Sequence, residues 1–180
     1  MLFICSYTVK AQYDPIPDGF ISSVNKVIKD YPNRFVNLMG RSIPELVDYG
    51  YESRITIPGS SYCRIINTNV SGLYFNASYI ALYSETEEAY SLALKQFNTL
   101  VSYFENSTFL VPMAKGVFKQ MAKKEDMGQQ QEQSFNGISS DQAYKDLQIK
   151  VNLAMNYYIK DQSKPDTWQQ YYEVSIKIKR

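Results

Sequence analysis

The sequence predicts an α+β protein, in which an antiparallel sheet of about five strands has two or three helices packed on one face. Three observations support this fold class. Apolar residues recur with helical spacing over 20–28 and 89–104, they alternate with a period of two over 51–83 and 147–178, and turn-forming residues separate these segments. The predicted order is helix, three strands, helix, a candidate third helix, and two strands.

The first predicted helix begins after Asp18, a residue type that caps helix N-termini. Its apolar side chains are Phe20, Ile21, Val24, Val27 and Ile28. This spacing puts all five side chains on one stripe of the helix, which we expect to face the core. Pro32 marks the end of the helix, because proline cannot donate the next backbone hydrogen bond.

A meander of three strands follows. The stretches ESRITI at 52–57 and SYCRII at 61–66 predict two strands joined by a type II turn, with Pro58 and Gly59 at its central positions. Residues 73–83 then alternate with apolar side chains on both faces. This pattern is typical of a central strand, which is covered on both sides.

The second predicted helix spans 84–104 and has the clearest periodicity in the chain. Ser84 and Glu87 match a capping box, in which each side chain bonds the backbone of the other residue. Glu85, Glu87 and Glu88 stand together in its first turn. We interpret them as favourable charges at a helix N-terminus and not as a metal or acid/base site.

A long hairpin is predicted near the C-terminus. Residues 147–159 and 168–178 alternate between apolar and polar side chains, and DQSKPD at 161–166 forms the turn between them. Both strands therefore have one face for the core and one polar face.

The segment 106–143 is too long for an ordinary loop and is predicted to be a flexible connector. Its first part carries Met113, Val117, Phe118 and Met121 at helical spacing. Two interpretations stay open. A third helix that completes the core, followed by a disordered stretch, is favoured over a methionine- and phenylalanine-lined flap that binds a partner.

Residues 1–11 match the end of a secretory signal peptide, with Val9-Lys10-Ala11 as the cleavage site. A leader remnant is favoured over an N-terminal edge strand, because the alternation is poor. Residues 12–180 then form a single α+β domain located outside the cytoplasm, either periplasmic or secreted. No other apolar run approaches the roughly 20 residues that span a bilayer, so the protein is not expected to cross a membrane.

Composition excludes several kinds of function. The 19 basic and 18 acidic residues nearly cancel, which gives no electrostatic reason to bind nucleic acid. The chain has no histidine, so histidine-based catalysis and metal binding are excluded. With Cys5 in the leader, Cys63 is predicted to be a buried structural thiol; a bridge between the two requires that the leader be retained. We predict no cofactor and no metal.

The missing catalytic groups favour a non-catalytic binding or interaction protein of the bacterial envelope, with a protein or a glycan as its partner. The sequence is also compatible with a homodimer. The candidate binding side chains lie on the final hairpin and on the 113–121 segment: Tyr157, Trp168, Tyr171, Met113, Phe118 and Met121.

The alternative function is a carboxylate-based hydrolase that acts on glycans. Its two carboxylates would come from Asp14, Asp18, Glu52, Glu85 and Glu173. Glycosidases need two such groups about 5–9.5 Å apart in one cleft. We favour the binding protein, because the hydrolase rests on residue types alone.

Overall fold

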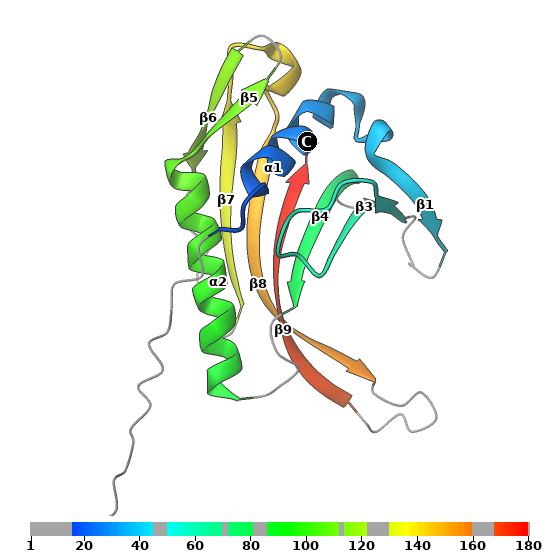
Figure 1. Ribbon diagram of the computed structural model, residues 1–180, viewed down its shortest axis with the longest axis vertical. Helices are drawn as coiled ribbons and strands as arrows, with labels where there is room; N and C mark the ends of the chain where they lie inside the picture. Colours follow the sequence, from blue (N-terminus) through cyan, green and yellow to red (C-terminus); the bar gives the residue numbers. More distant parts are fainter. Residues whose placement is uncertain are drawn as a thin grey trace, which may run out of the picture.

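The computed structural model describes residues 16–44, 50–69, 72–80, 86–111, 114–121, 130–159 and 168–179. Within these ranges the chain is predominantly β, with two α-helices and nine strands in one antiparallel sheet (Figure 1). The prediction of an α+β fold with about five strands and two or three helices is therefore wrong. The excess strands come from two segments in which we expected no strand.

Four strands build the N-terminal part of the sheet: β1 (Met39–Ile43), β2 (Gly50–Ser53), β3 (Tyr62–Thr68) and β4 (Gly72–Ile80). Strand β1 was not predicted. A Cβ atom at Gly40 would lie 2.9 Å from the carbonyl oxygen of Glu52, so glycine permits the close approach of β1 to β2. The predicted turn before β3 is confirmed: Gly59 has φ 83, and the amide of Ser60 donates to the carbonyl of Ile57. The strand predicted over 52–57 is wrong in its bounds, because β2 ends at Ser53 and residues 54–57 are not in a strand.

Three further strands lie inside the predicted connector: β5 (Thr108–Val111), β6 (Ala114–Gln120) and β7 (Gln131–Ile138). The predicted third helix is wrong, because its residues form β6. Val117 and Phe118 are 49% and 8% exposed, as expected for neighbours on opposite faces of a strand. Residues 122–129 lie outside the described ranges.

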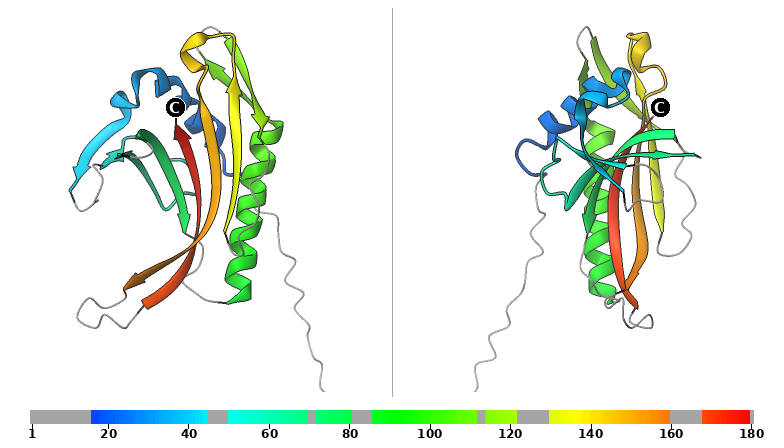
Figure 2. Two further views of the ribbon diagram at one scale, coloured as in Figure 1. Left: turned by 180° about the vertical axis from the view of Figure 1, so that it is seen from behind. Right: turned by 90° about the vertical axis from the view of Figure 1, so that its right-hand side faces the viewer.

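The predicted C-terminal hairpin is confirmed as β8 (Gln148–Ile159) and β9 (Trp168–Lys179), which pair along their whole length. The strand order is β1-β2-β3-β4-β9-β8-β7-β6-β5. Strand β9 therefore joins the N-terminal strands to the C-terminal ones. The sheet is strongly twisted, and the far end of the hairpin projects from the body of the molecule (Figure 2).

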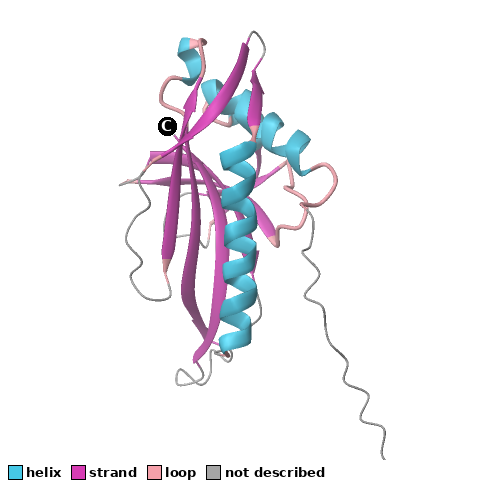
Figure 3. Cartoon of the chain, turned by 90° about the vertical axis from the view of Figure 1, so that its left-hand side faces the viewer, coloured by secondary structure: helices cyan, strands magenta, loops and turns pink. Residues whose placement is uncertain are grey.

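Both helices pack on one face of the sheet. Helix α1 (Phe20–Asp30) contacts helix α2 (Glu87–Asn106) through the rings of Phe20 and Tyr103, whose centroids lie 5.0 Å apart. Helix α2 lies lengthwise along the strands (Figure 3). Its Tyr90 ring lies 5.5 Å from the ring of Tyr172 of β9, measured between centroids. The core between the helices and the sheet is rich in phenylalanine.

The predicted helix caps are wrong. Gly19, with φ 82 and no side-chain bond, precedes α1 where Asp18 was expected to cap it. The hydroxyl of Thr86 accepts from the amide of Ala89 and caps α2, whereas Ser84 lies outside the described residues. Neither helix combines the length and apolar character that a bilayer-spanning helix needs, and the same holds for the other described residues.

Candidate functional site

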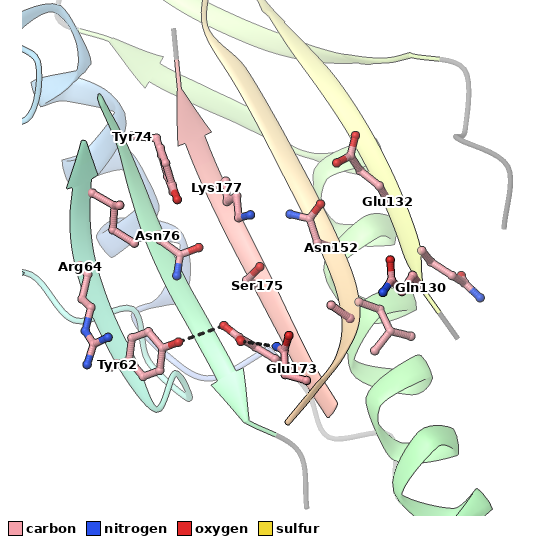
Figure 4. Close-up of a pocket in the computed structure, with 15 residues that line it drawn as sticks. Tyr62, Arg64, Tyr74, Asn76, Gln130, Glu132, Asn152, Glu173, Ser175 and Lys177 are labelled. Atoms are coloured by element: carbon pink, nitrogen blue, oxygen red, sulfur yellow. Dashed lines mark hydrogen bonds between the residues drawn. The ribbon is translucent and has the colours of Figure 1, made fainter. Parts of the chain in front are cut away.

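A cleft of ≈ 440 Å³ lies on the face of the sheet that the helices do not cover (Figure 4). Alternation along β9 fixes this placement. Tyr172, Val174 and Ile176 are buried in the core, so Glu173, Ser175 and Lys177 point to the opposite face and line the cleft. The volume falls within the roughly 300–1,000 Å³ of small-molecule sites.

Strand register explains why the sheet is hollowed here. One cross-strand row consists of Tyr62, Ser78, Ser175, Asn152 and Glu132, from β3, β4, β9, β8 and β7. The two serines are short and stand in the middle of the row. Longer side chains rise on both sides of them, so the floor is low and the walls are polar.

Glu173 is held by three donors from three strands. The hydroxyl of Tyr62 donates to its Oε1 atom at 3.0 Å, and the hydroxyl of Ser78 donates to the same oxygen. The Nδ2 atom of Asn156 donates to Oε2 at 2.8 Å. Both carboxylate oxygens are therefore engaged by the protein, and the side chain is fixed in position.

The Glu173 network leaves one buried acceptor without a partner. Because Ser78 gives its proton to Glu173, its oxygen accepts from the Nδ2 atom of Asn76 at 2.8 Å. The Oδ1 atom of Asn76 then has no partner among the described residues, although the residue is only 5% exposed. Nδ2 of Asn152, a donor, is likewise buried and unpaired there. A buried polar atom without a hydrogen bond costs about 1–3 kcal/mol.

Charged groups of both signs surround the cleft. The Nζ atom of Lys150 lies 2.7 Å from Oε1 of Glu132. The guanidinium of Arg64 sits over the Tyr62 ring, 4.3 Å from its centroid. Within the described ranges, no three Asp, Glu or Cys side chains gather as a metal site.

Burial and the nearby charge of Glu173 raise the pKa of Tyr62 to about 12, from the ordinary value of 10.0. We expect a difference titration of wild type against Tyr62→Phe to show this phenol ionising near pH 12. The protonated Tyr62 phenol contributes fully to the stability of the fold below pH 10. This contribution is lost as the pH rises through about 12, because the phenol of the unfolded state ionises at a lower pH than that of the folded state. Ultraviolet absorbance of tyrosinate measures the transition. A Tyr62 signal that appears near pH 10 would contradict both the burial of this phenol and the effect of the Glu173 charge.

None of the predicted aromatic residues on the hairpin lines this cleft, although Tyr171 lies on the same face of the sheet, directly opposite Asn156. Tyr157 and Trp168 are 54% and 58% exposed, and their register puts them on the same face of the hairpin. Tyr171 is half-buried and points to the opposite face from its core neighbour Tyr172. The structure therefore brings only two of these side chains onto a common surface.

The predicted residues of the 113–121 segment do not form one site either. Phe118 is a core residue, with ring centroids 4.8 Å from Phe109 and 5.4 Å from Phe104. Met121 is 42% exposed just after β6. Met113 lies outside the described residues.

The three predicted hydrolase carboxylates that the structure describes do not converge. Glu173 lines the cleft, Glu52 is ion-paired with Arg41 at 2.8 Å beside a neighbouring hollow, and Asp18 is exposed before α1. Asp14 and Glu85 lie outside the described residues. Glu132, which we did not select, shares the cleft with Glu173 but is bound by Lys150.

The sequence did not lead us to predict most residues of the cleft. One sequence feature could have indicated the site: Asn76 and Ser78 are polar residues in a strand, 72–80, whose other residues are typical of an apolar central strand. Polar side chains at buried positions of a central strand need partners, so they mark a site.

Comparisons with protein-family models, with curated proteins and with solved structures gave no significant match. The fold and the cleft define the class: an antiparallel β protein with helices on one face of its sheet and a polar cleft on the other.

Proposed function

We propose that this is a non-catalytic binding protein whose cleft takes a sugar unit of a glycan. The observation that carries the proposal is the pair of buried, unpartnered amide atoms, the acceptor Oδ1 of Asn76 and the donor Nδ2 of Asn152. A hydroxyl group both donates and accepts a hydrogen bond. A polyhydroxylated ligand can therefore satisfy both atoms in one pose.

The place of the cleft in the sheet supports a sugar over a peptide. Strands β4, β9 and β8 form its centre, and each is paired on both sides. Their backbone groups are used within the sheet, so a peptide finds no free edge on which to add a strand. The ligand must therefore be bound by side chains, and those that line the cleft are mostly amides, hydroxyls and charged groups.

The state of the carboxylates favours binding over hydrolysis. A glycosidase needs one carboxyl group that donates a proton to the leaving group and a second that attacks or activates water. Both oxygens of Glu173 accept bonds from the protein, and Glu132 is paired with Lys150. Both groups are suited to orienting a ligand.

The proposal includes a location outside the cytoplasm, with an envelope glycan as the ligand. It is supported by the cleavage-like pattern at Val9-Lys10-Ala11. That pattern lies outside the described residues, so the location stays a prediction from sequence.

Calorimetric titration with cellotriose, chitotriose, trigalacturonic acid and sulfated lactose tests the function. We expect at least one of these sugars to bind, and Asn76→Ala to weaken its binding about tenfold, as for a lost buried hydrogen bond. Asn98→Ala, at an exposed asparagine on α2, is the matched control and should bind as wild type does. Circular dichroism checks that each variant is folded, and Asn152→Ala serves as a second cleft variant.

Two outcomes would overturn the proposal. Either no sugar of the panel binds the wild type, or both cleft variants bind as well as it does. Proton NMR of each sugar after long incubation should show an intact ligand, whereas cleaved products would indicate the hydrolase.

A further inference from the structure

Three lysines stand together on the face of the sheet that carries the cleft. Lys150 of β8 and Lys177 of β9 are directly opposite each other, and Lys179 is the next residue of β9 on the same face. Like charges at directly opposite positions of an antiparallel pair are destabilising. The fold nevertheless keeps this arrangement beside the cleft.

Among the described residues, only Lys150 of the three lysines has a carboxylate partner. Glu132 pairs with Lys150, whereas no described carboxylate lies within ion-pair distance of Lys177 or Lys179. Burial lowers the pKa of Lys179, and the charge of Lys150 lowers it further, whereas the charge of Glu132 opposes the shift. The cluster therefore has excess positive charge in a partly dehydrated place.

Lys177 connects this cluster to the cleft. It lines the cleft and stands in the cross-strand row between Asn76 and Lys150. Asn152, whose Nδ2 donor has no partner among the described residues, is in the adjacent row. Glu173 forms no ion pair with Lys177, and its oxygens accept from Tyr62, Ser78 and Asn156.

We propose that the ligand of this cleft is an acidic sugar, whose carboxylate or sulfate group is bound by Lys177 and by Nδ2 of Asn152. This inference rests on the proposed function and narrows it. An oxyanion accepts from an ammonium and from an amide at once, and such charge-assisted bonds are about twice as strong as neutral ones. The hydroxyls of the same sugar reach Oδ1 of Asn76.

Calorimetry with matched pairs of sugars tests the inference. One pair is trigalacturonic acid and its methyl ester, and the other is 3′-sulfated lactose and lactose. We expect a charged member to bind at least tenfold tighter than its neutral partner, with affinity that falls as salt is added. The pair that shows this preference identifies the group as a carboxylate or a sulfate.

Lys177→Gln tests the residue. We expect it to lower the affinity for the charged sugar about tenfold and to remove most of the salt dependence, while Lys177→Arg retains the preference for the charged member. Lys119→Gln, at an exposed lysine of β6, is the control and should bind as wild type does. The melting temperature of Lys177→Gln should not fall, because the substitution relieves the repulsion with Lys150.

The outcomes separate this inference from the function on which it rests. Neutral members that bind as tightly as charged ones overturn the acidic ligand and leave the sugar-binding function standing. A charged sugar that binds Lys177→Gln as well as wild type overturns the role of the lysine. If no sugar binds the wild type, the proposed function itself is wrong.

Discussion

Replacing Phe104 with alanine should lower the free energy of unfolding by about 3–5 kcal/mol, the usual cost of removing a buried phenylalanine. Phe104 is 0% exposed, and its ring contacts Phe118 of β6 and Phe135 of β7 at centroid distances of 5.4 and 5.8 Å. The side chain joins α2 to two strands that have few other large inward residues. The substitution therefore leaves a cavity between α2 and the rings of Phe118 and Phe135.

Urea unfolding followed by circular dichroism measures this loss. Leu92→Ala is the matched control, because Leu92 lies on the same helix and is 45% exposed. Its cost should stay below about 1 kcal/mol, since little apolar area leaves a core. Similar losses for the two variants would contradict the packing of α2 on β6 and β7.

Replacing Gly116 with alanine should cost about 1–3 kcal/mol, although alanine is the smallest residue with a side chain. A Cβ atom at this position would lie 2.0 Å from Cζ of Phe109, the residue directly opposite in β5. The ring of Phe109 covers the glycine and packs against Phe118 at 4.8 Å and Tyr144 at 6.4 Å. It cannot move away without disturbing two other aromatic residues.

A double-mutant cycle identifies the cause of this loss. Phe109→Leu removes the far end of the ring, so Gly116→Ala should cost less in that background than in the wild type. Lys115→Ala, at the exposed neighbour of Gly116, should change stability by less than about 0.5 kcal/mol. Additive losses at positions 109 and 116 would mean that the ring is not the obstacle.

The sequence predicts the elements whose patterns are local and strong. The stripe over 20–28, the periodicity over 89–104 and the alternation over 147–178 correspond to α1, α2 and the β8–β9 hairpin. One side chain of the first stripe was placed wrongly, because Ile21 is 55% exposed. In each of these, nearly every inward position holds an apolar side chain. The spacing of apolar residues within one such segment is therefore enough to predict the element and its buried face.

Strands β6 and β7 escape prediction because glycine takes inward positions where an apolar side chain is expected. Gly116 is covered by Phe109, and a Cβ atom at Gly137 would lie 2.7 Å from Cδ2 of Leu147. A large residue from another segment fills each space. The second inward position of β7 is also unusual: Gln133 is 1% exposed, and its amide donates to the carbonyl of Met121 at 2.9 Å.

The cleft escapes prediction for a different reason. Its residues are brought together only by the pairing of strands that are distant in the sequence. This pairing sets Ser78 of β4 opposite Ser175 of β9 and brings Tyr62 to Glu173. Glu173 was selected from its residue type and only as a hydrolase candidate. No pattern within either segment indicates that β4 and β9 are neighbours.

The central position of β9 has a consequence for how the chain is made. Strand β4 ends at Ile80 and its partner β9 begins at Trp168, so α2 and strands β5 to β8 are synthesised before the two can pair. Until then β4 has an open edge, which exposes the nascent chain to mispairing with other strands. The cleft itself does not exist before β9 is inserted. Ligand binding should therefore report the completed fold and distinguish it from any partly folded form that retains the helices.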